Sequence, residues 1–256
     1  MTWIELDGAV NVRDVGGLPL GDGGVTAEGR LLRADNLQEL SAADVARLVD
    51  GIGLTTVVDL RSTAELTAEG PAPLDAVASV RHAHHPVLPE AGLATDVVAD
   101  VFLVRDEQDR SRYPADRLTG HYLGYLEDRP EQVVAAVRSI ATSDGAAVVH
   151  CAAGKDRTGV VVALALSAVG VRPEAVVADY VATGERVEPL LARLRRKPIY
   201  APDVNSKPAS AHLPRPETMA AFLEQVDARY GGAAGWLTKH GFGDELARLR
   251  ARLRES

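Results

Sequence analysis

The chain has 256 residues, of which 46% are hydrophobic and 25% are charged, and its formal net charge is −8. This composition is ordinary for a folded globular protein and excludes wholesale disorder, and the length is enough for a sizeable core. The acidic balance argues against a general nucleic-acid binder, which would normally carry a basic stripe.

Cysteine usage and hydropathy indicate in which cellular compartment the protein is expected. Cys151 is the only cysteine, so no intrachain disulfide can form and the fold needs no oxidising environment. The opening MTWIELDGAV lacks the basic and apolar regions of a signal peptide. The longest apolar run, 160–169, is too short to span a bilayer. We therefore expect a cytoplasmic protein, and leave export by an unconventional route open.

The first part of the chain predicts two strands around a helix. Glycine-rich turns precede a short strand at 29–33. In LSAADVARLVDGIG, Ser41 is a good N-cap and Asp44 completes the capping-box spacing, so this stretch predicts a helix that ends at its closing glycines. The run 54–60 predicts a buried strand.

Strands and helices continue to alternate further along. SVRHAHHPV alternates like a strand, and 116–141 has a helical pattern broken near Pro130. The strand AAVVH leads to an apolar helix over 157–169, and Pro173 suits the first turn of the next helix. This order indicates βαβ units, and hence an α/β fold with a central, mainly parallel twisted sheet flanked by helices.

A proline-rich stretch interrupts the second half. Five prolines lie between Pro198 and Pro216, so we predict neither regular helix nor central strand there. A long irregular segment in a compact domain is often a lid or binding loop, and an ordered surface loop or a linker fits the composition equally well. We expect one domain over 1–256, with 185–216 as a candidate lid and helices after it.

The stretch VVHCAAGKDRTG predicts a phosphate-binding loop. A strand, then Cys151, then a helix beginning near Arg157 would direct unpaired N–H groups and the positive helix end towards one anion. Ala152, Ala153 and Gly154 have little side chain to obstruct that curve, and Gly154 permits a positive φ. The Arg157 guanidinium matches two phosphate oxygens.

The same field should act on the thiol. Beside Lys155 and Arg157, the pKa of Cys151 should fall from about 8.5 into the range of roughly 3.5–7.5, which makes it a nucleophile at neutral pH. We expect His150 to order the loop, Lys155 to bind substrate and Thr158 to stabilise the departing thiolate. The simpler alternatives are a buried structural cysteine, a solvated lysine and a capping threonine.

HCAAGKDRTG resembles the HCxxGKDRT signature of the bacterial atypical protein tyrosine phosphatases. NVRDVGGL, VVDLRSTAE, AVVADYV and RYGGAAGWLTKHG are also similar to this family, so the resemblance runs from about Asn11 to Gly241. It implies a cysteine-phosphatase fold and a phosphocysteine intermediate, with no metal and no cofactor. It also implies activity on phosphotyrosine, with phosphoserine, phosphothreonine or phosphoinositides as further substrates in some members.

Three carboxylates compete for the role of general acid. Asp156 lies in the loop, and the resemblance favours it. Glu90 lies near the position where family members carry an aspartate after proline. Asp59 ends a strand, where parallel sheets place functional groups, but its alternative role is to bind Arg61. We rank them in that order.

The predicted substrate is a phosphorylated protein or a small-molecule phosphate such as a nucleotide, sugar phosphate or inositol phosphate, since fold does not settle the substrate. A phosphate-binding module without catalysis is the alternative from another class. Membrane contact is expected only if a phosphoinositide is a substrate. His82, His84 and His85 raise a metal hypothesis, but no second ligand cluster accompanies them, and a surface or core role is favoured.

Overall fold

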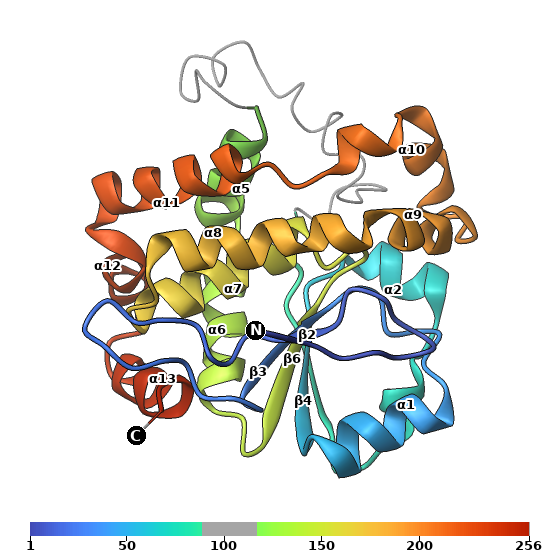
Figure 1. Ribbon diagram of the computed structural model, residues 1–256, viewed down its shortest axis with the longest axis horizontal. Coiled ribbons are helices and arrows are strands. Elements are labelled where there is room, and N and C mark those ends of the chain that lie inside the picture. Colours follow the sequence, from blue (N-terminus) through green and yellow to red (C-terminus); the bar gives the residue numbers. More distant parts are fainter. Residues whose placement is uncertain (89–116, 256) are drawn as a thin grey trace.

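The computed structural model describes residues 1–88 and 117–255, so Glu90 lies outside the described residues (Figure 1). Within those two ranges, six strands form one sheet in the order β1-β2-β3-β6-β4-β5. The last four of these are parallel: β3 (Leu31–Ala34), β6 (Ala146–His150), β4 (Leu54–Asp59) and β5 (Arg81–His84). An antiparallel edge is added by β1 (Thr2–Trp3) and β2 (Arg13–Asp14). The predicted α/β fold is confirmed.

Neighbouring residues of the central strands belong to different hydrophobic clusters. In β6, Val148 lies in one cluster and Val149 in another, and Val57 and Val58 of β4 divide in the same way. Because successive strand side chains point to opposite faces, both faces of the sheet are buried. That is why these strands read as continuous apolar runs.

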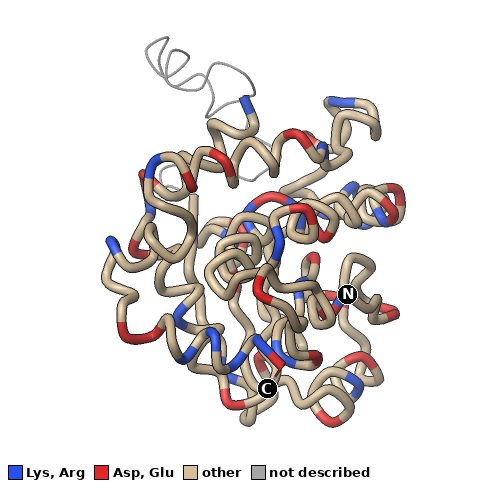
Figure 2. Tube along the Cα trace, turned by 60° about the vertical axis from the view of Figure 1, so that its left-hand side comes forward, with Lys and Arg blue, Asp and Glu red and all other residues tan. Residues whose placement is uncertain are grey.

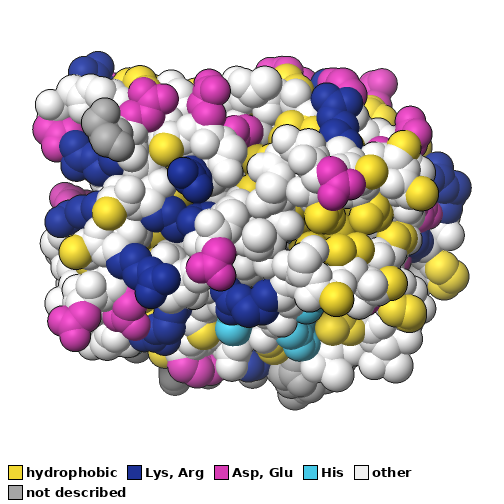
Figure 3. Space-filling view, turned by 90° about the horizontal axis from the view of Figure 1, so that it is seen from below, with side chains coloured by type: hydrophobic (Ala, Val, Ile, Leu, Met, Phe, Trp, Pro, Cys, Tyr) yellow, Lys and Arg dark blue, Asp and Glu magenta, His cyan; other side chains and the backbone are white. Residues whose placement is uncertain are grey.

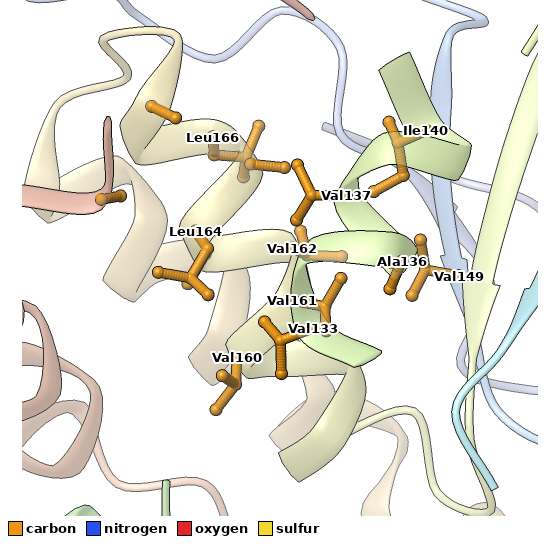
Figure 4. Close-up of a cluster of buried hydrophobic side chains, with 14 of the residues drawn as sticks. Val133, Ala136, Val137, Ile140, Val149, Val160, Val161, Val162, Leu164 and Leu166 are labelled. Atoms are coloured by element: carbon orange, nitrogen blue, oxygen red, sulfur yellow. The ribbon is translucent and has the colours of Figure 1, made fainter. Parts of the chain in front are cut away.

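The larger cluster, which we call the apolar layer, contains the core of the helical side (Figure 4). There α6 contacts β4 and β5, and α7 contacts β6 and β3. The helices that contribute to it are α5 (Arg117–Asp128), α6 (Pro130–Ala141), α7 (Asp156–Ala168), α8 (Pro173–Ala182), α11 (Pro216–Tyr230), α12 (Gly232–Lys239) and α13 (Glu245–Leu253).

The other face is covered by shorter elements: α1 (Ala42–Ala46), a π-helical turn at Arg47–Gly51 and a 3₁₀ turn at Pro73–Ala76. The Ser41 hydroxyl accepts from the Asp44 N–H and the Asp44 carboxylate accepts from the Ser41 N–H, which confirms the predicted capping box. The helical pattern broken near Pro130 is confirmed as the pair α5 and α6.

One prediction for the proline-rich stretch is wrong. Regular helix is present there as α10 (Ala201–Ser206), because Pro202 falls in the first turn, where no intrahelical N–H is needed. Before it lies α9 (Val187–Arg195). Tyr200 and residues of α9 and α10 form a third hydrophobic cluster with Ala152 and Ala153, so this segment packs directly on the loop after β6 (upper right in Figure 1).

Charges of both signs are mixed over the exterior. Along the trace, Lys and Arg are interspersed with Asp and Glu (Figure 2). The face seen from below shows the same mixture, with hydrophobic side chains gathered towards one side of it (Figure 3). In the described ranges no helix combines the length and hydropathy needed to cross a bilayer.

Candidate active site

The loop of interest joins β6 to α7. Cys151 directly follows the strand, α7 begins at Asp156, and both residues are buried. Gly154 has φ +66°, as predicted, and a Cβ there would lie 2.3 Å from the Ala34 carbonyl oxygen. Only glycine fits this close approach of two backbones. The sequence therefore fixes the curvature of the loop at this position.

The carbonyl groups of the loop are hydrogen-bonded from the β3 side of the molecule. The three bonds are Asn36 N–H to Ala152 O (3.0 Å), Asn11 Nδ2 to Ala153 O (2.9 Å) and Arg33 Nη2 to Gly154 O (2.7 Å). In a trans peptide the N–H points opposite to the C=O. The three following N–H groups of the loop therefore face away from these donors, and successive N–H groups that share a direction are what an anion-binding nest requires.

A buried ionic group stands behind these bonds. Asp179 of α8 accepts from Arg13 Nε (2.8 Å) and from Arg33 Nη1 (2.5 Å). Burial alone would raise the pKa of Asp179, but the charges of Arg33 and Arg13 lower it below its usual value. Desolvation and the charge of Arg33 lower the pKa of Arg13 to about 10. We call Asn11, Arg13, Arg33 and Asp179 the polar layer.

Arg157 is fixed by a carboxylate from α2 (Thr63–Glu69). Its Nη1 lies 2.6 Å from Glu65 Oε2 and its Nη2 lies 2.9 Å from Oε1, and both side chains are 0% exposed. Despite burial, the charge of Arg157 lowers the pKa of Glu65. Glu65 Oε2 also accepts the Ser62 N–H in a capping box. Glu65 is not among the site residues predicted from the sequence, although the SxxE spacing in DLRSTAE is a signal for it.

Asp59 is engaged with Arg61, which is the alternative role considered for it. Its oxygens accept from Arg61 Nε (3.0 Å) and Nη2 (2.6 Å), and His150 Nε2 lies 3.4 Å from Oδ2. Burial acts to raise the pKa of Asp59, but the charge and hydrogen bond of His150, followed by those of Arg61, hold it well below its usual range. The other ring nitrogen of His150 lies 3.3 Å from the Cys151 carbonyl, next to the loop that it was expected to order.

Asp156 and Thr158 lie where the loop joins α7, and their side chains differ in hydrogen bonding. Lys155 donates to Asp156 Oδ1 at 2.7 Å. Burial opposes ionisation of Asp156, but the charge and hydrogen bond of Lys155 lower its pKa. Asp156 also accepts from Tyr122, a contact that no motif in the sequence predicts. Thr158 Oγ1 is buried and has no hydrogen-bond partner among the described residues, so its O–H is available to another acceptor.

The three histidines near β5 do not converge. His82 lies beside Asp75 and Leu74, His84 Nε2 lies 2.8 Å from the Arg61 carbonyl, and His85 Nε2 lies 2.9 Å from Ser139 Oγ. Over residues 1–88 and 117–255, no group of three or more histidine, cysteine or acidic side chains could hold a metal ion.

Fold and loop together define a class: an α/β protein that presents a cysteine and an arginine on one loop between a parallel strand and a helix. Residues 4–255 match the model of the tyrosine phosphatase family, and the chain belongs to that family. The chain is therefore a phosphatase of the protein tyrosine phosphatase type.

The relatives agree with the family match. The triple specificity protein phosphatase PtpB of Mycobacterium tuberculosis is 31% identical over 268 residues, which cover 93% of each chain. A candidate tyrosine-protein phosphatase of Cupriavidus necator is 33% identical over 72% of this chain and 63% of its own length. A tyrosine-protein phosphatase of Nostoc commune is 29% identical over 52% and 46% respectively. The resemblance read from the motifs is confirmed.

Proposed function

We propose that this phosphatase hydrolyses phosphotyrosine monoesters through a covalent phosphocysteine at Cys151. The observation that carries the proposal is the set of three loop carbonyls bonded from the β3 side, which leaves N–H groups to surround a phosphoryl dianion above the sulfur. The Arg157 guanidinium, which two hydrogen bonds to Glu65 hold in place, lies at the start of α7.

In the first step the Cys151 thiolate attacks phosphorus. An S–P bond forms, the P–O bond to the tyrosine oxygen breaks, and a carboxylic acid gives its proton to that oxygen. In the second step water attacks phosphorus, its proton returns to the carboxylate, and the S–P bond breaks. The uncommitted Thr158 hydroxyl can then donate to the departing thiolate.

Asp156 is the carboxylate that we propose as the acid and base. Unlike Asp59, whose two oxygens both accept from Arg61, Asp156 receives its hydrogen bonds within the described residues at Oδ1. A bound phosphate dianion places negative charge beside this carboxyl group, which raises its pKa and lets it arrive protonated. Glu90 remains a candidate outside the described residues.

For the substrate, we propose phosphotyrosine first, with phosphoserine, phosphothreonine and phosphoinositides as further candidates. The name of the mycobacterial relative, triple specificity protein phosphatase, supports testing a broad panel. The alternative substrate, a small-molecule phosphate, requires the same loop. We further propose one phosphatase domain over 1–256, in which 185–216 covers the substrate, since Tyr200 and α9 pack on Ala152 and Ala153.

The mechanism is tested with Cys151→Ser, which should abolish turnover of phosphotyrosine peptides while the unfolding midpoint stays near that of the unchanged protein. Vanadate should inhibit and a chelator should have no effect. Retained turnover in Cys151→Ser would refute the mechanism. Parallel assays on nucleotides, sugar phosphates and phosphoinositides at equal concentration decide the substrate class.

The acid is assigned with a matched set of three variants: Asp156→Asn, Asp59→Asn and Glu90→Gln. Each is assayed on aryl phosphates with good and poor leaving groups. Loss of the true acid slows the poor leaving groups most, because only they need the proton. We expect this pattern for Asp156→Asn, and finding it in either of the other variants would reassign the role.

A further inference from the structure

Tyr122 is a buried residue outside the loop that faces Asp156. It lies on α5, its side chain is 0% exposed, and its hydroxyl donates to Asp156 Oδ1. The Tyr180 hydroxyl of α8 lies 2.8 Å from the Tyr122 hydroxyl. The two rings are edge-to-face at 6.2 Å, and Phe222 packs edge-to-face against Tyr122 at 6.1 Å. These ring contacts fix where the hydroxyl points.

A glycine in α7 makes room for this arrangement. A Cβ at Gly159 would lie 3.1 Å from Tyr180 Cδ2, tighter than ordinary van der Waals contact. Tyr180 can therefore lie close to α7, one turn beyond Asp156. The tyrosine pair is thus set by the packing of α5, α7, α8 and α11, and not by the loop itself.

Both donors to the Asp156 carboxylate reach the same oxygen. Lys155 Nζ lies 2.7 Å from Oδ1, and Tyr122 donates to Oδ1 as well. No hydrogen bond from a described residue reaches Oδ2, and the side chain keeps 8% of its surface exposed. A carboxyl group held by one oxygen in this way has the other oxygen available for proton exchange.

The Tyr122 phenol remains a donor throughout the accessible pH range. Burial first, and the charge of Asp156 second, raise the pKa of Tyr122 well above its usual value. A donor to the ionised carboxylate favours that form and lowers the carboxyl pKa. Among residues 1–88 and 117–255, the other titratable groups that face Asp156 are Lys155 in the loop, His121 of α5, Tyr180 of α8 and His212 in the 3₁₀ turn Ala209–His212.

We propose that Tyr122 is a positioning residue for Asp156: backed by Tyr180, its hydroxyl holds Oδ1, so that Oδ2 exchanges the proton with the leaving oxygen and then with water. This inference rests on the proposed function, because it gives Asp156 the role of acid and base. The inference adds that the Tyr122 hydroxyl determines which oxygen of Asp156 reacts and at which pH this carboxyl group titrates.

The test is the pH profile of kcat for phenyl phosphate in Tyr122→Phe, because kcat reports ionisations in the complex that contains the bound dianion. Loss of the donor should raise the pKa of Asp156, so the alkaline limb that reports this acid should move upward by about one pH unit. Tyr180→Phe should move it in the same direction by less. The matched control is Tyr230→Phe on α11. Its ring contacts Lys239 of α12, which is not one of the groups that face Asp156, so this variant should leave the limb in place.

A structural role for Tyr122 would give a different result. Tyr122→Phe would then lower the turnover of substrates with good and poor leaving groups equally and would leave the alkaline limb in place. Its effect would also add to that of Asp156→Asn, and this combination of results overturns the inference. The inference predicts that Tyr122→Phe adds no further loss in an Asp156→Asn background, because the two residues act as one unit. If the loss of turnover in Asp156→Asn is the same for good and poor leaving groups, the inference is also overturned.

If Tyr122→Phe fails to fold, 3-fluorotyrosine at position 122 keeps the shape and makes the phenol a stronger donor. The limb should then move downward, and an unmoved or raised limb contradicts the inference. Failure of the proposed function is seen separately, because it appears as retained turnover in Cys151→Ser. An inactive Cys151→Ser together with an unshifted Tyr122→Phe removes only the role of Tyr122.

Discussion

The apolar layer and the polar layer both contact the loop after β6, and different interactions stabilise them. In the apolar layer, Val161, Leu164 and their neighbours pack without directional bonds (Figure 4). In the polar layer, Arg33 spans Asp179 and the Gly154 carbonyl with directed hydrogen bonds. Apolar packing depends on volume, whereas a buried ionic group depends on every partner being present.

This difference indicates what the polar layer is for. A buried ion pair stabilises a fold weakly, because desolvation offsets most of its Coulomb attraction. The polar layer instead places the carbonyls of Ala153 and Gly154, and through them the N–H groups opposite. We infer that it contributes to loop geometry more than to stability, and the following variants test that inference.

The largest effect is expected for Asp179→Ala. It leaves Arg13 and Arg33 buried side by side without their carboxylate, which should cost about 3–5 kcal/mol in the free energy of unfolding. Urea denaturation measures it, with the exposed Asp227→Ala as a control expected to change stability by less than about 0.5 kcal/mol. A loss below about 1 kcal/mol for Asp179→Ala would show that the two arginines do not depend on it.

A smaller loss of stability is expected for Arg33→Lys, which keeps the charge. Lysine lacks the planar fork with which Arg33 directs Nη1 to Asp179 and Nη2 to the Gly154 carbonyl. We expect about 1.5–3 kcal/mol of destabilisation and a fall in kcat of about tenfold or more, because the loop carbonyl is released. Unchanged kcat in a folded Arg33→Lys protein would separate this arginine from loop geometry.

Leu164→Met is the corresponding change in the apolar layer. The volume is nearly conserved, so the cost should stay below about 1.5 kcal/mol, and kcat per folded molecule should be unchanged. If kcat falls as far as in Arg33→Lys, the contrast between the two layers is wrong. Both variants are measured by urea denaturation and by initial rates on the same aryl phosphate.

The smallest expected difference is a change in how steeply stability falls with pH in the acidic range. The folded pKa of Glu65 is lowered, so its stabilisation is fully present above its unfolded value of about 4.3 and is lost as pH falls through the lower folded pKa. Glu65→Gln should therefore lose less stability than the unchanged chain over that acidic range. The control is the exposed Glu188→Gln, which should retain the original slope, and an unchanged slope in Glu65→Gln would contradict the pairing with Arg157.

The elements that depend on local chemistry could be predicted from the sequence. Ser41 and Asp44 form their capping box, the helical pattern does break near Pro130, and Gly154 adopts the positive φ that its loop needs. The proline-rich stretch was predicted less well, since Pro202 was treated as a helix breaker although a first-turn position tolerates it.

The supporting residues of the site could not be found in this way, because their partners are distant in the sequence. Glu65 and Arg157 are 92 positions apart, and Arg13 and Asp179 are 166 apart. A buried arginine and a surface arginine look identical in a single sequence. Only the packing of α2 and α8 against the loop reveals which carboxylates meet which cations.

The central claim, that Cys151 forms a bond to phosphorus on this loop, is tested most directly by trapping the intermediate. The enzyme is quenched in denaturant while it turns over an aryl phosphate with a good leaving group, and its peptides are analysed by mass spectrometry. We predict a phosphoryl group on the peptide containing Cys151, none in Cys151→Ser, and more in Asp156→Asn, where the base for hydrolysis is missing. Steady turnover with no phosphoryl group on that peptide, or with one on another residue, would contradict the account.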